Sequence, residues 1–197
     1  MSIGRTESVA LLGLSGSVVE IEVDIADGLP GFSLLGLPDA ALSESRDRVR
    51  AALTNCSEAW PNKKVTVSLS PAWLPKSGSG FDLSIALALL IAQQTLPQTP
   101  FMQTTILGEL ALDGKIRAVR GVLPALIAAY KAGIHRAIVP TANRAEAQLM
   151  SAMEVLTFAT LHEVLMWART GVTPQAQELD LEIDVSASYL DFADVAG

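Results

Sequence analysis

The sequence predicts an α/β fold in which helices cover a mixed β-sheet to form a sandwich. Helical and strand-like patterns alternate along most of the 197 residues, as they do when helices pack on a sheet. Two pairs of strand-like segments are separated by short turn sequences, which is typical of antiparallel hairpins. A sheet that contains hairpins as well as strand–helix–strand connections is mixed rather than wholly parallel. The hydrophobic content of 50% is enough to bury one ordinary core.

The first half of the chain opens with a hairpin. Residues 8–12 and 17–25 have strand composition, and the second segment alternates apolar with acidic side chains. Leu14-Ser15-Gly16 is the turn expected between them. The pattern then predicts a short strand over 32–35, a helix from Asp39 to Leu53, a strand over 64–70 and an apolar helix over 83–93. Asp82 precedes the apolar helix and is its expected N-cap.

The second half contains the clearest hairpin signal in the sequence. Strand-like residues 105–112 are followed by the turn dipeptide Asp113-Gly114 and by a returning strand over 115–119. The remaining elements are expected as a helix over 121–131 with Gly133 as its C-cap, a strand over 137–139, a helix over 143–151, a strand over 154–158 and a helix over 161–169.

Charge divides the chain into two parts. The formal net charge is -7, but six carboxylates and no Lys or Arg follow Arg169, so the preceding residues carry a net charge of only -1. We therefore expect a domain over 1–170 and an acidic linker over 171–197. Within the linker, Asp180, Glu182 and Asp184 alternate as in a solvated strand face or a linker. A strongly basic surface over the whole domain is excluded, but a local basic patch stays open.

Composition also bears on location. The richest apolar stretch, from Leu83 to Ala92, is about half the roughly 18 to 20 residues that a membrane span needs. The first residues lack the basic and apolar regions of a secretory signal. Cys56 is the single cysteine, so no internal disulfide can form. We expect a cytoplasmic chain that has no membrane partner.

Catalytic and cofactor motifs are missing from the sequence. The one Gly-Lys pair, Gly114-Lys115, is followed by isoleucine rather than Ser or Thr and has no glycine at the P-loop spacing. The two histidines, His135 and His162, have no recognisable serine and carboxylate partners. Two separated histidines and one cysteine do not make a metal-ligand set. We therefore expect no catalytic, cofactor or metal site in this chain.

Basic side chains are the most suggestive charged feature. Arg46 and Arg50 share one face of a helix, whereas Arg48 points elsewhere. Two interpretations stay open: local salt bridges to Glu44 and Asp47, or contacts to phosphate or to a neighbouring subunit. Further candidate contacts of the same kind are Lys76, Arg117 and Arg120. Trp60 and Trp73 flank loops and are either base-stacking residues or edges of the core.

Several long segments resemble one protein family, in one order along the chain. They are Gly28-Leu-Pro-Gly-Phe-Ser-Leu-Leu-Gly-Leu-Pro-Asp39, Glu44-Ser-Arg-Asp-Arg-Val-Arg-Ala-Ala-Leu53, Val65-Thr-Val-Ser-Leu-Ser-Pro-Ala-Trp-Leu-Pro-Lys76, Gly80-Phe-Asp-Leu-Ser-Ile-Ala-Leu87, Leu107-Gly-Glu-Leu-Ala-Leu-Asp-Gly114 and Val119-Arg-Gly-Val-Leu-Pro-Ala125. Residues 4–169 resemble the N-terminal domain of the magnesium-chelatase-like AAA+ ATPases of the YifB/ComM family. The resemblance implies a fold like ribosomal protein S5 domain 2, which the Lon protease domain shares.

The family resemblance also implies a function for a longer protein. Residues 189–197 resemble the lead-in to an AAA+ ATPase module that is absent from this chain. The resemblance implies ATP hydrolysis with Mg²⁺ in that module, hexameric rings, and branch migration of DNA. This chain is then a non-catalytic domain whose partners are its own AAA+ module, neighbouring subunits and DNA. Insertion of magnesium into a porphyrin is not implied, because the chelatase name reflects similarity of the ATPase module.

The likeness to Lon raises the alternative of a degenerate peptidase. Lon uses a serine and a lysine, and aligning its motifs places Gly80 and Ala125 at those two positions. Ser79 is one position away, but no lysine lies within 121–129 to activate it. Two minor hypotheses stay open: a peptidase around Ser77, Ser79 and Asp82, and a small-anion site at Gly78–Asp82. A purely structural domain in ring assembly is a weaker form of the non-catalytic domain described above.

Overall fold

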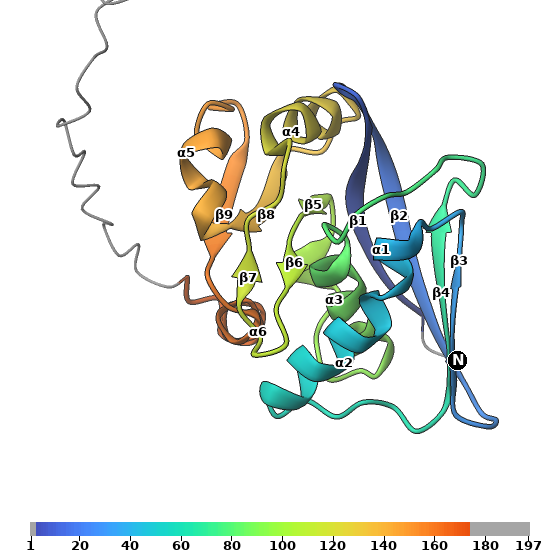
Figure 1. The fold of residues 1–197 in the computed structure, drawn as a ribbon. Coiled ribbons are helices and arrows are strands. Elements are labelled where there is room, and N and C mark those ends of the chain that lie inside the picture. The colour runs from blue at the N-terminus through green and yellow to red at the C-terminus, as the bar shows by residue number, and fades with distance from the viewer. Residues whose placement is uncertain (1–2, 174–197) are drawn as a thin grey trace, which may run out of the picture.

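A seven-stranded mixed sheet organises the protein. The structure is a computed structural model that describes residues 3–173. The strand order is β3-β4-β2-β1-β5-β8-β9, and a separate two-stranded sheet pairs β6 with β7. Figure 1 shows helices on the sheet, so the predicted mixed α/β sandwich is confirmed.

The antiparallel half of the sheet contains the predicted opening hairpin. β1 (Ile3–Leu12) pairs antiparallel with β2 (Ser15–Ala26), and β2 pairs antiparallel with β4 (Lys64–Ser70). β3 (Gly31–Leu35) runs parallel to β4 at the edge of the sheet. The hairpin turn lies at residues 13–14, slightly before the expected Leu14-Ser15-Gly16. Gly13 has a φ of +63°, a conformation that favours glycine in a tight turn.

The other half of the sheet is parallel. Its strands are β5 (Thr104–Ile106), β8 (Arg136–Pro140) and β9 (Glu154–Phe158), and β5 also runs parallel to β1. The short hairpin of β6 (Glu109–Leu110) and β7 (Ile116–Arg117) lies outside this sheet. The predicted turn at Asp113-Gly114 connects these two strands, so the second hairpin is confirmed.

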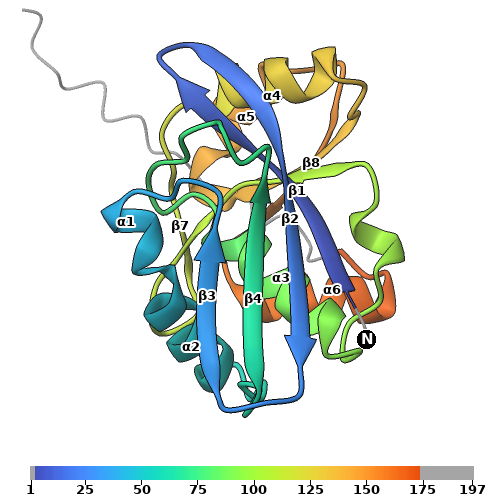
Figure 2. The same cartoon turned by 90° about the vertical axis from the view of Figure 1, so that its right-hand side faces the viewer.

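Helices cover both faces of the parallel half and, through α4, part of the second face of β1 and β2, whereas only one face of β3 and β4 is covered. The helices are α1 (Ala40–Ser43), α2 (Ser45–Asn55), α3 (Asp82–Ala92), α4 (Val122–Lys131), α5 (Arg144–Ala147) and α6 (Leu161–Thr170), with 3-10 turns at Thr99–Phe101 and Thr141–Asn143. Residues of α2, α3 and α6 share one hydrophobic cluster with the sheet, while α4 and α5 belong to a second cluster. Figure 2 shows the outer face of β2, β3 and β4 without a covering helix.

The apolar helix α3 forms the centre of the core. All of its side chains are buried, which explains its apolar sequence. Its closest neighbour is β1, where a Cβ on Gly4 would lie 1.9 Å from the carbonyl oxygen of Ala88. Within residues 3–173, no helix combines the length and apolar character that crossing a membrane requires.

Gly108 and Asp82 are two positions at which the sequence prediction is wrong. The strand expected over 105–112 is divided into β5 and β6, because the backbone at Gly108 bonds elsewhere: its carbonyl accepts from Leu83 N, and its N–H donates to Gly80 O. Asp82 is the first residue of α3 and not its N-cap, which is Phe81. The Asp82 side chain is buried and has other partners, described below.

Candidate functional site

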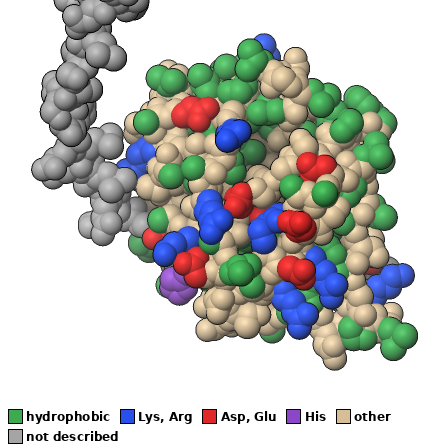
Figure 3. Space-filling model, in the orientation of Figure 1, with side chains coloured by type: hydrophobic (Ala, Val, Ile, Leu, Met, Phe, Trp, Pro, Cys, Tyr) green, Lys and Arg blue, Asp and Glu red, His purple; other side chains and the backbone are tan. Residues whose placement is uncertain are grey.

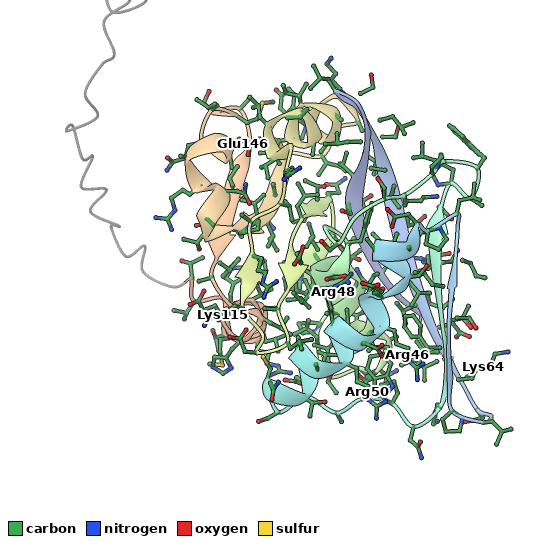
Figure 4. All side chains as sticks on the ribbon, in the orientation of Figure 1. Arg46, Arg48, Arg50, Lys64, Lys115 and Glu146 are labelled. Carbon is green, nitrogen blue, oxygen red and sulfur yellow. The ribbon has the colours of Figure 1, made fainter. Side chains whose placement is uncertain are left out.

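Two exposed arginines lie on the outer side of α2. Arg46 and Arg50 are separated by one helical turn, and both are exposed. Within residues 3–173 neither side chain forms an ion pair, so the local salt-bridge interpretation fails for these two. Figure 4 shows both on the outer side of α2, with the exposed Lys64 on the same lower part of the molecule. The sequence analysis missed Lys64, because it treated residues 64–70 only as a strand.

Arg48, between them in sequence, points into the protein. Its Nε lies 2.6 Å from Asp82 Oδ2 and its Nη2 lies 3.0 Å from Asp82 Oδ1, which is a two-pronged ion pair. Nη2 also donates to the carbonyl oxygen of Ala41, and Nη1 lies 3.5 Å from Glu44. The local salt-bridge interpretation is confirmed for Arg48 only in its contact with Glu44. Its main partner, Asp82, was not expected, and this pair joins α2 to α3.

Asp82, the partner of Arg48, is a buried carboxylate. Burial raises its pKa to about 6, although the Arg48 guanidinium and the N–H of Leu110 favour the charged form. Its side chain is fully inaccessible to solvent. Asp82 thus serves to hold α2, α3 and β6 together, and it is not free to act on a substrate.

Lys76 is removed from the set of candidate contacts. Its side chain is completely buried, and its Nζ donates to the carbonyl oxygens of Leu69 and Pro71. Burial lowers the pKa of this ammonium group. Its backbone bonds to Leu37 and Asp39, so Lys76 ties two loops together inside the protein. Because the Lys76 ammonium group is buried and donates to two carbonyl oxygens, it presents no charge to DNA.

Arg117 and Arg120 lie beside the β6–β7 hairpin, as expected. Arg117 is exposed and its Nη1 lies 3.4 Å from Glu109 Oε1. Arg120 is exposed and forms no ion pair within residues 3–173. Figure 3 shows that basic and acidic side chains alternate over this face, which is the face that carries α2 and the hairpin. The surface is therefore a mixed one with unpaired arginines rather than a continuous basic patch.

A groove of about 450 Å³ separates the loop over 77–81 from residues 118–121. Gly80 and Ala125 both line it, although they are far apart in sequence. Ser79 also lines it, and its hydroxyl donates to the carboxylate of Glu109. Glu109 is the partner that the sequence analysis missed, because the strand pattern around it gave no sign that it faces the loop.

The same groove contains no basic group that could activate a serine. Its lining includes Arg120 but neither lysine nor histidine. The Glu109 carboxylate also lies 3.4 Å from Arg117 Nη1, so it is shared between Arg117 and the Ser79 hydroxyl. The small-anion hypothesis is also disfavoured. The N–H of Gly78 already donates to the Asp39 carboxylate, so it is not available to an anion.

Comparison with known proteins identifies the family. Residues 21–143 match the family described as "Subunit ChlI of Mg-chelatase". The chain belongs to this ChlI family. Three relatives are Uncharacterized protein Rv2897c of Mycobacterium tuberculosis, competence protein ComM of Haemophilus influenzae and Uncharacterized protein YifB of Salmonella typhimurium, which are 50%, 39% and 42% identical.

The chain corresponds to a minor part of each relative. All of it aligns with Rv2897c and with ComM but spans 39% of either protein, and 77% of it aligns with 30% of YifB. The predicted resemblance to YifB and ComM is confirmed.

The ChlI-family chain also has a more distant similarity to Lon protease. It is 26% identical to Lon protease of Salinispora arenicola over 91% of this chain and 24% of the relative. The positions that the alignment with Lon assigns to serine and lysine, Gly80 and Ala125, line one groove. Neither residue has a reactive side chain, so the groove lacks the Ser-Lys pair.

The remaining candidates are Trp60, Trp73, His135 and a metal site. Trp60 is half-buried and packs against Phe32 with ring centroids 5.9 Å apart, so it is an edge of the core. Trp73 is 74% exposed, so the core-edge interpretation is wrong for this residue. His135 packs edge-on against Tyr130 at 5.0 Å. Among residues 3–173, no three His, Cys, Asp or Glu side chains are arranged to hold a metal ion.

Proposed function

We propose that this chain is the non-catalytic N-terminal domain of a longer magnesium-chelatase-like AAA+ ATPase of the ComM/YifB type. The observation that carries the proposal is the alignment of the whole chain with 39% of ComM, within a family named for a chelatase subunit. ATP and Mg²⁺ would then bind in an AAA+ module beyond this chain, and the full protein would form hexameric rings in the cytoplasm. Catalysis belongs to that module.

DNA is the proposed partner of the arginine surface, which consists of Arg46, Arg50, Arg117 and Arg120. Arg46 and Arg50 lie one turn apart, both are exposed, and neither is neutralised by a carboxylate within residues 3–173. Guanidinium groups at this spacing suit adjacent oxygens of a phosphate backbone. Arg117 and Arg120 extend the surface to the β6–β7 hairpin. In the full-length protein, this surface would guide DNA toward the ring as the motor moves a branch point.

Binding of the 197-residue chain to labelled single-stranded and forked DNA tests the proposal. We expect binding at low salt that is weakened in the Arg46→Gln/Arg50→Gln variant. The charge-preserving Arg46→Lys/Arg50→Lys variant should retain most of the binding. Lys131→Gln, which removes an exposed charge on α4, should bind like the original chain. Equal binding by all four proteins would place the DNA contact elsewhere in this chain, and no binding at low salt would leave the contact to the AAA+ module.

A domain that only stabilises the ring is the second candidate, and the mixed charge of the arginine surface favours it. Such a domain would contact a neighbouring subunit through Arg46 and Arg50 instead of DNA. Unchanged DNA affinity of the Arg46→Gln/Arg50→Gln variant, together with weaker ring assembly of the longer protein, would support this candidate.

A further inference from the structure

One face of the antiparallel half of the sheet is open and acidic. Apolar residues of β2 alternate with acidic ones, and the apolar set is buried in the cluster that contains α2 and α3: Val19, Ile21 and Val23. Successive side chains of a strand point to opposite faces of the sheet, so the acidic set points away from α2 and α3: Glu20, Glu22 and Asp24. Figure 2 shows no helix over this face at β2, β3 and β4.

β1 adds a fourth carboxylate to the same face. The register places Glu7 of β1 directly opposite Glu20 of β2. Like charges at directly opposite positions destabilise a sheet. We call Glu7, Glu20, Glu22 and Asp24 the acidic face. Arg5 is the only basic residue of β1 and β2, and Lys64 stands at the first position of β4. Carboxylates therefore outnumber basic groups on this face.

Two of the four carboxylates lack a cation. Arg5 Nε lies 2.8 Å from Glu22 Oε1 and 3.6 Å from Glu20 Oε1. Within residues 3–173, Glu7 and Asp24 form no ion pair, and one oxygen of each, Oε2 and Oδ1, is shielded from solvent without a hydrogen-bond partner. Burial and the charge of Glu20 raise the pKa of Glu7. A cation that reaches these two carboxylates from outside would stabilise their charged forms.

A groove of about 760 Å³, the β1 groove, adjoins the acidic face. Its lining combines carboxylates with exposed apolar side chains, among them Glu7, Glu20, Ile3 and Met102. Gln98 fixes the opposite wall to β1: its Oε1 accepts from Arg5 N at 3.1 Å, and its Nε2 donates to Arg5 O at 2.6 Å. A long basic side chain suits this groove, because its methylene groups pack on apolar lining while its charged end reaches a carboxylate.

We propose that the acidic face and the β1 groove dock an extended basic segment of a partner protein. Alternate residues of an extended segment project to one side about 7 Å apart, which matches the spacing of the alternate residues Glu20, Glu22 and Asp24. Lysine or arginine side chains at such positions pair with the acidic face, and one of them enters the β1 groove beside Glu7.

The charge of the acidic face determines the class of partner. Four carboxylates repel the phosphate backbone of DNA and attract a basic protein segment. The acidic face also lies on the opposite side of the sheet from α2, which carries Arg46 and Arg50. The docking surface is therefore separate from the proposed DNA contact and does not depend on it.

Binding of the 197-residue chain to a labelled seven-residue peptide that alternates lysine with threonine tests the proposal. Fluorescence anisotropy at low salt compares the original chain with the Glu7→Gln/Asp24→Asn variant. We expect the variant to bind about tenfold more weakly, because two partly exposed ion pairs are lost. A peptide that alternates glutamate with threonine should not bind either protein.

The matched control is the Asp47→Asn/Glu154→Gln variant, which removes two exposed carboxylates from α2 and β9. It should bind the lysine peptide like the original chain. The six carboxylates after Arg169 are unchanged in both variants, so they cannot produce a difference between them.

Thermal unfolding shows whether the substitutions leave the fold intact. Glu7→Gln/Asp24→Asn should not lower the unfolding temperature, because it relieves the repulsion between Glu7 and Glu20. If this variant unfolds, Glu20→Gln takes its place, since the Glu20 side chain is 49% exposed. Glu20→Gln should weaken peptide binding by about threefold.

Four outcomes would overturn the proposal. The first is no binding of the lysine peptide to the original chain. The second is equal affinity of the original chain and the folded acidic-face variant. The third is an equal loss of affinity in the control, which would show a general effect of charge. The fourth is a dimer of the original chain in light scattering that the Glu7→Gln/Asp24→Asn variant abolishes, because the occupant of the acidic face would then be a second copy.

Discussion

At the scale of single residues, three arginines within five positions of α2 have two different roles. Arg46 and Arg50 face solvent, while Arg48 is paired with the buried Asp82. The helical period of the sequence separates Arg48 from its neighbours, but it does not show which face is inward. That depends on Asp82, which lies 34 positions away and was expected to cap a helix. The pairing of Arg48 with Asp82 is a tertiary contact, so no local pattern in the sequence predicts it.

The first prediction concerns the stability that this pair provides. Arg48→Met should destabilise the domain by about 3 kcal/mol, because it leaves the buried Asp82 carboxylate without its cation. Arg46→Met is the matched control on the same helix and should change the unfolding free energy by less than about 0.5 kcal/mol. Urea unfolding measures both, and equal effects of the two substitutions would contradict the assignment.

The second prediction concerns pH. Asp82 has a pKa of about 6 in the folded protein, above its ordinary value of 3.8. A raised pKa means that the folded state holds the proton more tightly. The stability that Asp82 contributes is therefore fully present below about pH 4 and is lost as the pH rises through 6.

The Asp82→Asn variant isolates this contribution. Asparagine cannot ionise, so the variant should gain about 3 kcal/mol of unfolding free energy relative to the original chain as the pH rises from about 4 to 7. Urea unfolding at intervals across this range gives the difference at each pH. A difference that stays constant would show that the pKa of Asp82 is not raised.

At the scale of elements, the packing of α3 on β1 depends on a missing side chain. A Cβ on Gly4 would lie 1.9 Å from Ala88 O and 2.6 Å from Ala92 N, both of which are backbone atoms of α3. Gly4→Ala should therefore cost about 3 kcal/mol or more, because the helix has to move. Gly31→Ala on the edge strand β3 is the control, since its nearest neighbour lies at 3.8 Å. Thermal unfolding should show a large decrease only for Gly4→Ala.

Most elements follow from local patterns in the sequence. The strands over 64–70 and 154–158 have the predicted bounds, because alternation and flanking turn residues define them. The helix expected from Asp39 to Leu53 is divided at Glu44, and Asp39 caps its first part through Leu42 N. The division of the strand over 105–112 was not predictable, because the bonding partners of Gly108 lie in the loop and helix near residue 80.

At the scale of the whole molecule, the fold brings the α2 arginines to the same face as the β6–β7 hairpin. The sequence analysis named five candidate basic residues, and the four arginines among them are exposed. It did not show that Lys76 is buried, because lysine is rarely found inside a protein. It also did not place Ser79 beside Glu109, since that contact depends on how the loop packs on the hairpin.

The most direct test of the proposed DNA contact is the salt dependence of binding. The affinity of the 197-residue chain for forked DNA is measured across a salt series, with the Arg46→Gln/Arg50→Gln variant beside it. If both arginines contact phosphates, the slope of log K against log salt should decrease in magnitude by about 2 in the variant. An unchanged slope, with the fold intact by circular dichroism, would contradict the account and leave Arg46 and Arg50 without a role in DNA binding.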